Sequence, residues 1–284
     1  MSRTIGNGWQ SVGTHAVLVR PGGGMRVRDA IRVQDGAAWI DPELFTLGHE
    51  HLEAVRQRSP TAHDGVVLVF QHFDGDTLIA QRGGYFAMIA TADALRAEAI
   101  GDPNDRGPLR RRALALSENR PMQSGFGRAA AVGVSVVTTV GVAFGRAAIL
   151  GRRRTDLATD PGHWHVVPSG MIEPAPPGED PLLTTIAREL REELGLSITG
   201  LENRLQMLGI AYDEARMRPE ICLRLDLDVN ESEGASPRGE EYDIADIVPI
   251  PFTDLELQRP LTPPARGALA LLDLQHGALA EGAS

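Results

Sequence analysis

Lysine is absent from this sequence of 284 residues, in which all 28 basic residues are arginine. The absence excludes chemistries that depend on a lysine side chain, among them a Walker-type phosphate loop, a Schiff base and a lysine general base. Any phosphate group that is held by a side-chain cation must therefore be held by arginine.

Cysteine occurs once, as Cys222. A single thiol cannot form an internal disulfide and cannot provide a thiolate metal site by itself, so a reducing compartment is expected. Cys222 lies within a strand-like run, where it is expected to be a small buried hydrophobic residue. The first residues lack the apolar core of a signal peptide, and the expected location is the cytoplasm.

Long hydrophobic runs are also missing. The most apolar stretch, residues 129–150, is interrupted by Thr138, Thr139, three glycines and Arg146. Its β-branched residues and glycines favour two buried strands around a turn over a membrane-spanning helix. We therefore expect no membrane partner.

Positive charge is scarce, because 38 acidic residues outnumber the 28 arginines and leave a formal net charge of −10. Such a chain is a poor candidate for binding a nucleic acid polymer, which requires clustered positive charge. Residues 1–127 carry 14 acids and 14 arginines, whereas residues 128–284 carry 24 acids and 14 arginines. The whole surplus of carboxylates belongs to the second half of the chain.

The length favours two domains, since about 150 residues per domain is typical. The segment from Gly101 to Gly127 is mostly polar and broken, which indicates a boundary near residue 125. We expect a smaller α+β domain over residues 1–125. Over residues 126–284 strand, turn and helix patterns alternate, which is typical of an α/β domain.

Two helices have clear end signals. One is predicted from Asp41, a good N-cap followed by a proline, to about Arg58. The other is predicted from about Asp180 to Leu194, with Gly195 in the usual C-terminal position. In the second helix, apolar side chains recur at intervals of three and four residues and form a core-facing stripe of Leu183, Ile186, Ala187, Leu190 and Leu194.

Three carboxylates project from a neighbouring face of this second helix. Glu189, Glu192 and Glu193 stand at positions i, i+3 and i+4. A hard divalent cation would neutralise them, and Mg²⁺ or Mn²⁺ suits an all-carboxylate site better than Zn²⁺. The alternative is a solvated acidic face with Arg188 and Arg191 as local partners, which is the usual role of a charge run.

The residues around the carboxylates favour the metal site. Residues 188–196 read Arg-Glu-Leu-Arg-Glu-Glu-Leu-Gly-Leu, which matches Arg-Glu-U-x-Glu-Glu-x-Gly-U, the core of the Nudix box, where U is a bulky aliphatic residue. Asp180 takes the place of an earlier glutamate of the box. Gly170 is the opening glycine, but nine residues separate it from Asp180 where the family has five, which indicates an insertion. The chain resembles the Nudix hydrolase family over about residues 128–280.

This resemblance implies an α/β fold, a Nudix α/β/α sandwich with a mixed sheet, preceded by the α+β domain. It implies metal-dependent hydrolysis, with Mg²⁺ or Mn²⁺, of the diphosphate linkage of a nucleoside diphosphate joined to another moiety, X. A nucleotide sugar is favoured within this class by analogy, because an extra domain can enclose a larger leaving moiety. A small-molecule diphosphate is the expected partner. The sequence leaves open whether the chain forms a homodimer.

The resemblance also implies roles for individual residues. The metal ligands would be the carboxylates of Glu189, Glu192 and Glu193 and the carbonyl of Gly170. Arg188 would orient these carboxylates. The general base would be a box glutamate, Glu192 or Glu193, or an acid from a later loop, for which Glu240 and Glu241 are the candidates. A solvated acidic loop is the alternative for that pair.

Arginine must bind the diphosphate if any cationic side chain does. The first candidates follow a strand that precedes the box, and they are Arg152, Arg153 and Arg154. Trp164 would stack on a base or a sugar, although a tryptophan at the start of a strand is as often part of the core. Two further clusters, His49–His51 and Arg110–Arg112, are expected to have surface or packing roles.

Two other functions remain as alternatives. An isoprenoid diphosphate isomerase shares this fold but relies on a catalytic cysteine and a glutamate, and only Cys222 is present. A catalytically silent module would keep the fold as a ligand sensor. The three clustered carboxylates argue against the silent module, because such a module has no need for them.

Overall fold

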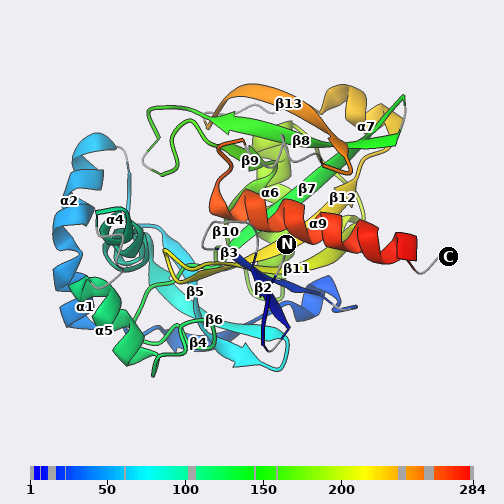
Figure 1. Cartoon of the computed structure of the whole chain (residues 1–284). Helices are drawn as coiled ribbons and strands as arrows, with labels where there is room; N and C mark the ends of the chain where they lie inside the picture. Colours follow the sequence, from blue (N-terminus) through cyan, green and yellow to red (C-terminus); the bar gives the residue numbers. More distant parts are fainter. Residues whose placement is uncertain are drawn as a thin grey trace.

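A computed structural model of the chain describes residues 3–6, 8–11, 17–22, 24–60, 62–101, 107–143, 145–157, 159–235, 241–252 and 259–281. The described residues form two sheets with helices packed against them (Figure 1). No helix among these residues is both long enough and apolar enough to cross a membrane.

The larger sheet has ten strands, and eight of them follow the order β1-β2-β3-β11-β12-β7-β8-β13. The remaining two are β10, which pairs with β7, and β9, which pairs with β8. β7 and β12 are parallel, and the other pairs are antiparallel, so the sheet is mixed as predicted. The strands are β1 (Arg3–Gly6), β2 (Trp9–Ser11), β3 (Val17–Pro21), β7 (Gly133–Val142), β8 (Gly145–Arg153), β9 (Trp164–Val166), β10 (Ser169–Met171), β11 (Leu205–Asp213), β12 (Arg218–Asp226) and β13 (Tyr242–Ile250).

Helices cover both faces of this sheet. α6 (Pro181–Glu189), which continues as the π-helical turn η3 (Leu190–Leu194), packs on one face, and α9 (Pro263–Glu281) crosses the other (Figure 1). Val136 belongs to the core on the α6 side and Val137 to the core on the α9 side, because alternate side chains of a strand point to opposite faces. The predicted α/β/α sandwich is therefore confirmed.

The smaller sheet lies in the first half of the chain, with the strand order β4-β6-β5. Its strands are β4 (Ile31–Ala37), β5 (Val66–Asp74) and β6 (Thr77–Gly84). The helices of this region are α1 (Pro42–Leu47), α2 (His49–Arg58), α3 (Tyr85–Met88), the π-helical turn η2 (Ile89–Asp93), α4 (Ala94–Gly101) and α5 (Pro108–Leu116). The short elements η1 (Val27–Asp29), η4 (Leu201–Asn203) and α7 (Val229–Gly234) complete the described structure.

The helix predicted from Asp41 to Arg58 is two helices, α1 and α2, that meet at Gly48. The predicted N-cap is confirmed, since the backbone N–H of Leu44 donates to the Asp41 carboxylate over 2.8 Å. The single helix is wrong because the backbone of Gly48 lies against Ala90, where a Cβ would approach the Ala90 carbonyl oxygen to 1.7 Å. Glycine permits this close approach of two backbones.

The two halves of the chain share hydrogen bonds and core. β3 pairs with β11, so the first strands of the chain extend the larger sheet. The backbone N–H groups of Leu68 and Phe70 in the smaller sheet donate to Ile172 and Ala130, and their side chains belong to the core on the α6 side. The domain boundary near residue 125 stays a prediction, and the two parts are joined closely across it.

Candidate functional site

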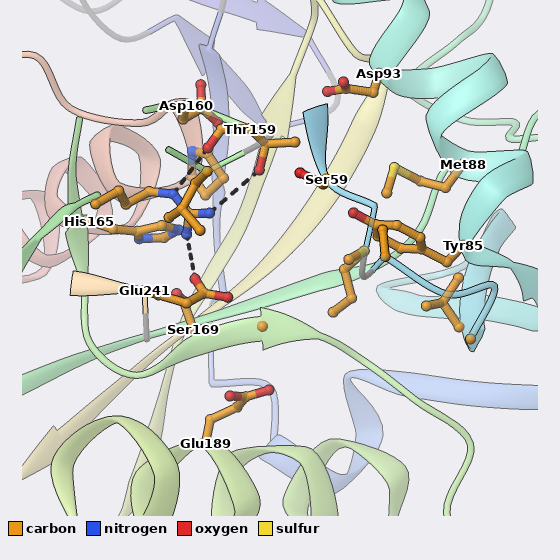
Figure 2. A pocket seen from close by; sticks show the side chains of 18 of the residues that line it. Ser59, Tyr85, Met88, Asp93, Thr159, Asp160, His165, Ser169, Glu189 and Glu241 are labelled. Atoms are coloured by element: carbon orange, nitrogen blue, oxygen red, sulfur yellow. Dashed lines mark hydrogen bonds and ion pairs between the residues drawn. The ribbon is translucent and has the colours of Figure 1, made fainter. Parts of the chain in front are cut away.

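A cavity of about 800 Å³ lies between the smaller sheet with its helices and the end of the larger sheet. Figure 2 shows Tyr85 and Met88 on one side of it, His165 and Glu241 on the other, and Glu189 on the helix below. Residues from both halves of the chain line this cavity. It therefore depends on the packing of the two halves.

Glu189, the last residue of α6, faces the strand that enters the box. A Cβ built on Gly170 would lie 2.4 Å from Glu189 Oε1, so only glycine leaves room for this carboxylate. Both residues line the cavity, as does the exposed carboxylate of Glu192. The structure therefore brings three of the four predicted metal ligands, Gly170, Glu189 and Glu192, to the same cavity.

Glu193 is held more tightly than the other two box carboxylates. Its side chain is buried, the backbone N–H of Ser169 donates to Oε2 over 3.0 Å, and the Tyr242 hydroxyl donates to Oε1 over 3.3 Å. A Cβ on Gly151 would clash with the Tyr242 ring, so this glycine makes room for the ring. The hydrogen bonds fix the direction of the Glu193 carboxylate.

The box helix changes its hydrogen bonding where the carboxylates begin. It is α-helical to Glu189, π-helical from Leu190 to Leu194, and ends at Gly195, whose φ of 69° confirms the predicted C-terminal glycine. The i→i+5 bonds of a π turn widen the helix, so the three carboxylates spread further round it than the α-helical spacing predicts. Among the described residues, no three His, Cys, Asp or Glu side chains form a group that could hold a metal ion.

The electrostatics of these carboxylates indicate a place for a cation. Burial raises the pKa of Glu189 to about 7, and the charges of Glu192 and Glu241 add to this effect while Arg188 opposes it. Burial also raises the pKa of Glu193 well above its usual value, and Glu189 and Glu241 add to it. The donor chemistry of these carboxylates therefore suits a hard divalent cation, whose charge would offset their mutual repulsion, although the described side chains do not converge on one point.

Arg188 contacts the carboxylate that it was predicted to orient. Its Nη2 donates to Glu189 Oε1 over 2.8 Å, and its Nη1 donates to Glu173 Oε1 over 2.7 Å. The guanidinium lines the cavity and is partly exposed. It can therefore hold Glu189 and also face a bound anion.

The three predicted diphosphate-binding arginines separate in the structure. Arg153 and Arg154 line the cavity, and Arg153 Nη1 donates to Glu241 Oε2 over 2.8 Å. Arg152 is not among the lining residues, and its guanidinium makes a bidentate pair with Asp243. Side chains alternate along β8, so neighbouring arginines point in different directions.

Trp164 also lies outside the lining of the cavity. Its ring packs against the core on the α9 side, and the Arg259 guanidinium lies 5.2 Å from the ring centroid. The structure therefore gives Trp164 the core role rather than a stacking role in this cavity. Of the two candidate acids of the later loop, Glu241 lines the cavity, whereas Glu240 lies outside the described residues.

The remaining candidates have packing roles. His51 Nε2 lies 2.9 Å from an Asp93 carboxylate oxygen, and Arg112 donates to Asp41 over 2.7 Å. Cys222 is fully buried, as predicted, and burial raises the pKa of its thiol well above the usual value. Cys222 is not among the residues that line the cavity.

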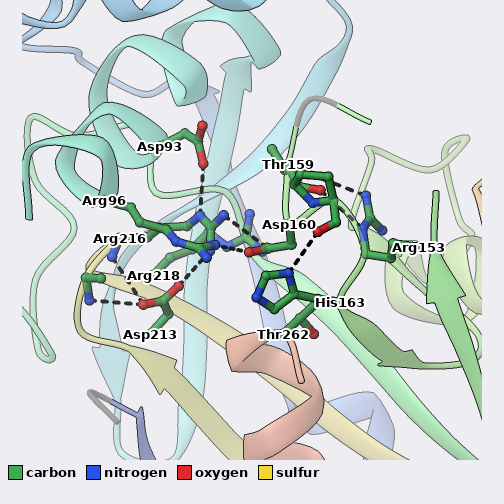
Figure 3. A network of polar contacts seen from close by, with 12 residues as sticks. Asp93, Arg96, Arg153, Thr159, Asp160, His163, Asp213, Arg216, Arg218 and Thr262 are labelled. Atoms are coloured by element: carbon green, nitrogen blue, oxygen red, sulfur yellow. Dashed lines mark hydrogen bonds and ion pairs between the residues drawn. The ribbon is translucent and has the colours of Figure 1, made fainter. Parts of the chain in front are cut away.

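Sequence reasoning missed a buried ion-pair network beside the cavity. Figure 3 shows it around Arg216, whose side chain is 5% exposed. The Arg216 guanidinium lies 2.9 Å from Asp93 in η2, 3.1 Å from Asp160 in the loop between β8 and β9, and 2.9 Å from Asp213 at the end of β11. Burial favours a raised pKa for Asp93, but His51 and Arg216 outweigh burial and lower it. Asp93 and Asp160 are far from Arg216 in sequence, so no local pattern reveals these two pairs, whereas Asp213 lies only three residues before Arg216.

The comparisons with known proteins address the second half of the chain. Residues 128–272 match the protein-family model described as the NUDIX domain. The search of curated proteins found no match.

Several solved structures resemble the same part of the chain. The NUDIX domain of Shewanella oneidensis NrtR, solved with ADP ribose, is 15% identical with a TM-score of 0.39, over 53% of this chain and 90% of that chain. An Ap4A hydrolase from C. elegans is 18% identical with a TM-score of 0.34, over 53% and 98% respectively. A MutT protein from Methanosarcina mazei Go1 is 18% identical with a TM-score of 0.36, over 51% and 94%.

Proposed function

Because this chain belongs to the Nudix hydrolase family, as its NUDIX domain over residues 128–272 shows, we propose that it hydrolyses the diphosphate linkage of a nucleoside diphosphate joined to a moiety X. A nucleotide sugar is the favoured substrate. The observation that carries this proposal is the meeting of box carboxylates and arginines in one cavity of about 800 Å³. That volume lies within the usual range for small-molecule sites and exceeds what a diphosphate alone would need.

The box residues would hold a divalent cation, Mg²⁺ or Mn²⁺. Its ligands would be the Gly170 carbonyl and the carboxylates of Glu189, Glu192 and Glu193. When bound, the cation would offset the charge of the diphosphate and lower the pKa of a bound water. Arg188 would keep the Glu189 carboxylate oriented through the 2.8 Å hydrogen bond between them.

Arg153 and Arg154 would bind the diphosphate oxygens. Both line the cavity, and a guanidinium can donate two parallel hydrogen bonds to a phosphate group. Arg153 donates to Glu241 and Arg154 to Asp156. These pairs keep the two guanidinium groups in place before the substrate arrives.

Glu241 is the preferred general base. Its half-exposed carboxylate lines the cavity and is oriented by Arg153. It would accept the proton of the attacking water. Glu193 fits this role less well, because both of its oxygens already accept hydrogen bonds from Ser169 and Tyr242.

A panel of diphosphate compounds, assayed with Mg²⁺ or Mn²⁺ and scored by the masses of the two products, tests this function. We expect a nucleoside monophosphate and the phosphate of X. Glu192→Gln should lower kcat at least about 100-fold, since it removes a charged ligand, whereas Glu50→Gln on the exposed face of α2 should not change it. Full metal-dependent hydrolysis by both Glu192→Gln and Glu193→Gln would contradict the mechanism.

The same panel separates the alternatives. An isomerase would leave the diphosphate intact and release no phosphate compound. The burial of Cys222 outside the cavity disfavours this activity, because the isomerase needs a reactive cysteine at its substrate. A silent ligand sensor would bind no Mn²⁺ in a titration and turn over none of the compounds.

A further inference from the structure

The cavity contains a second polar group that the proposed hydrolysis does not use. It consists of His165 on β9 and of Arg218 and Glu220 on β12, which we call the His165–Glu220 group. The exposed fractions of His165 and Glu220 are only 7% and 4%. Each has a buried atom with no hydrogen-bond partner among the described residues, Nδ1 in His165 and Oε2 in Glu220.

The Glu220 carboxylate is fixed with one oxygen left over. Ser135 Oγ donates to its Oε1 over 2.6 Å. Its Oε2 lies 3.5 Å from the Arg218 guanidinium, in an ion pair without a hydrogen bond. A Cβ on Gly133 would lie 1.9 Å from this Oε2, so the glycine makes the space that the carboxylate occupies. The oxygen is thus positioned by its neighbours and still lacks a hydrogen-bond donor.

His165 presents a neutral ring. Burial lowers its pKa to about 3, the charges of Arg153 and Arg218 lower it further, and Asp160 opposes them. The neutral imidazole has one N–H donor and one acceptor nitrogen. Burial also raises the pKa of Glu220, and the charge of Arg218 and the hydrogen bond from Ser135 oppose this rise. The three side chains line the same cavity.

Buried polar atoms are normally hydrogen-bonded, so two unpaired atoms in the lining of one cavity indicate missing ligand groups. A phosphate does not suit this place, because the Glu220 carboxylate offsets the charge of Arg218 and would repel the phosphate, and the neutral His165 would not attract it. A hydroxyl group both donates and accepts. Two neighbouring hydroxyl groups can donate to Glu220 Oε2 and complete the hydrogen bonding of His165.

The opposite side of the cavity suits a different part of the substrate. Tyr85 and Met88 face the cavity across from His165 (Figure 2). An aromatic ring and a thioether favour the flat apolar face of a base. The polar His165–Glu220 group is therefore left for the hydroxylated part.

We propose that His165 and Glu220 form a hydroxyl-binding subsite that selects substrates with neighbouring hydroxyl groups. This inference rests on the proposed hydrolysis and names the chemical class that the site accepts. The hydroxyl groups come either from a sugar as X or from the ribose of the nucleoside. Both sources present the same chemistry to Glu220 and His165.

The full-length chain with Mg²⁺ is assayed on three sets of substrates, each with the four common bases. They are nucleoside diphosphate hexoses, the 2′,3′-dideoxynucleoside versions of these, and nucleoside diphosphate ethyl esters. We expect the parent enzyme to have a KM at least about tenfold higher for whichever set lacks the recognised hydroxyl groups. The set of substrates with the raised KM shows whether the recognised hydroxyl groups belong to the sugar or to the ribose.

The variants are Glu220→Gln and His165→Phe. Each should raise KM about tenfold or more for the hydroxylated substrate and change kcat less than about twofold, because the lost hydrogen bonds lie away from the reacting atoms. KM for the set that lacks the recognised hydroxyl groups should not change. Glu231→Gln, which alters a partly buried carboxylate paired with Arg204, is the matched control, and thermal unfolding of every variant checks the fold.

Two results would overturn the subsite. One is a parent enzyme that does not distinguish the three substrate sets, and this result requires no variant to fold. The other is an equal rise of KM on all sets in both variants. If the parent enzyme hydrolyses none of these substrates, the proposed hydrolysis is wrong, and the subsite is tested separately. Calorimetric titration with the nucleoside diphosphate hexoses then tests the subsite, which requires binding by the parent and at least about tenfold weaker binding by the variants.

Discussion

Neighbouring arginines at the end of β8 occupy opposite environments. Arg153 lines the cavity and is 12% exposed in its side chain, whereas Arg152 is 37% exposed and pairs with Asp243. The sequence Arg152-Arg153-Arg154 does not distinguish them, because all three have the same side chain. Because successive side chains of a strand point to opposite faces of the sheet, the arginines can be told apart once the face toward the cavity is known.

Arg153→Gln should therefore raise KM for the diphosphate substrate about tenfold or more, since it removes a charge-assisted hydrogen bond donor from the cavity. Arg152→Gln should change KM less than about twofold, because an exposed ion pair contributes little. Steady-state kinetics on the same substrate compares the two. Equal effects of the two substitutions would contradict the assignment of Arg153 to the diphosphate.

His165 makes the folded state sensitive to acid. Its pKa is about 3 in the folded chain and ordinarily 6.5, so below pH 6.5 the unfolded chain binds a proton here that the folded chain does not. Protonation of His165 in the unfolded chain therefore does not affect the free energy of unfolding above pH 6.5, and it lowers this free energy progressively as the pH falls from 6.5 toward 3. The facing charged groups are Arg153, Arg218 and Asp160, and the pKa of Asp160 is lowered, so all three remain charged over most of this range.

We therefore expect the melting temperature of the parent protein to fall between pH 6.5 and about 4, and to fall less steeply in His165→Phe. Thermal unfolding at a series of pH values measures both slopes. The same slope in the two proteins would show that His165 is not buried as a neutral ring.

Elements from both halves of the chain meet at Arg216. The turn η2 supplies Asp93, the β8–β9 loop supplies Asp160 and the end of β11 supplies Asp213. Arg96 in α4 also pairs with Asp160. A buried charge that loses its partner is costly, and here one arginine is the partner of three carboxylates.

Arg216→Met should lower the free energy of unfolding by about 3 kcal/mol or more, because it leaves the buried Asp213 without its arginine and leaves Asp93 and Asp160 with only His51 and Arg96. Arg56→Met is the matched control, since Arg56 forms an exposed ion pair with Glu53 on α2. The loss in the control should be small. Urea unfolding of both variants measures the difference, and a similar loss in both would contradict the structural role of Arg216.

Local patterns predicted the elements but not their irregularities. The cap at Asp41 and the final glycine, Gly195, follow from residue type alone and are confirmed. The break at Gly48 was missed because it depends on contact with Ala90, and the π turn η3 was missed because its apolar spacing resembles that of an α-helix. Long-range contacts decide such details, and a single sequence does not contain them in readable form.

The same limit applies to the candidate site. The Nudix box identified Gly170, Glu189 and Glu192, which line the cavity. His165 and Glu220 have no pattern of their own, since their neighbours along the chain differ and only the pairing of β9 with β8 and of β12 with β7 brings them to the cavity. Cavity residues that belong to a motif were therefore predictable, and cavity residues that only the topology brings there were not.

At the scale of the whole molecule, the N-terminal half completes the larger sheet as well as the cavity. β3 pairs along β11, and Leu68 and Phe70 belong to the same core as Val134 and Ile186. A chain that begins at residue 126 would lose these partners. It would also expose the apolar surface that they cover.

We expect the fragment 126–284 to lack a cooperative unfolding transition and to aggregate, whereas the full chain should unfold cooperatively. Expression of both, followed by thermal unfolding and light scattering, checks this. A soluble fragment that unfolds cooperatively would support an autonomous second domain.

The two π turns have a consequence for how this chain tolerates insertions and deletions. η2 ends at Asp93 beside one part of the cavity, and η3 carries Glu192 and Glu193 beside another. A π turn holds one residue more than an α-helical turn, and each residue of an α-helix corresponds to a rotation of about 100°. Deleting one residue from either turn would therefore restore a regular helix while rotating these acids out of register. At these two turns, the number of residues in the chain therefore fixes where the acids lie.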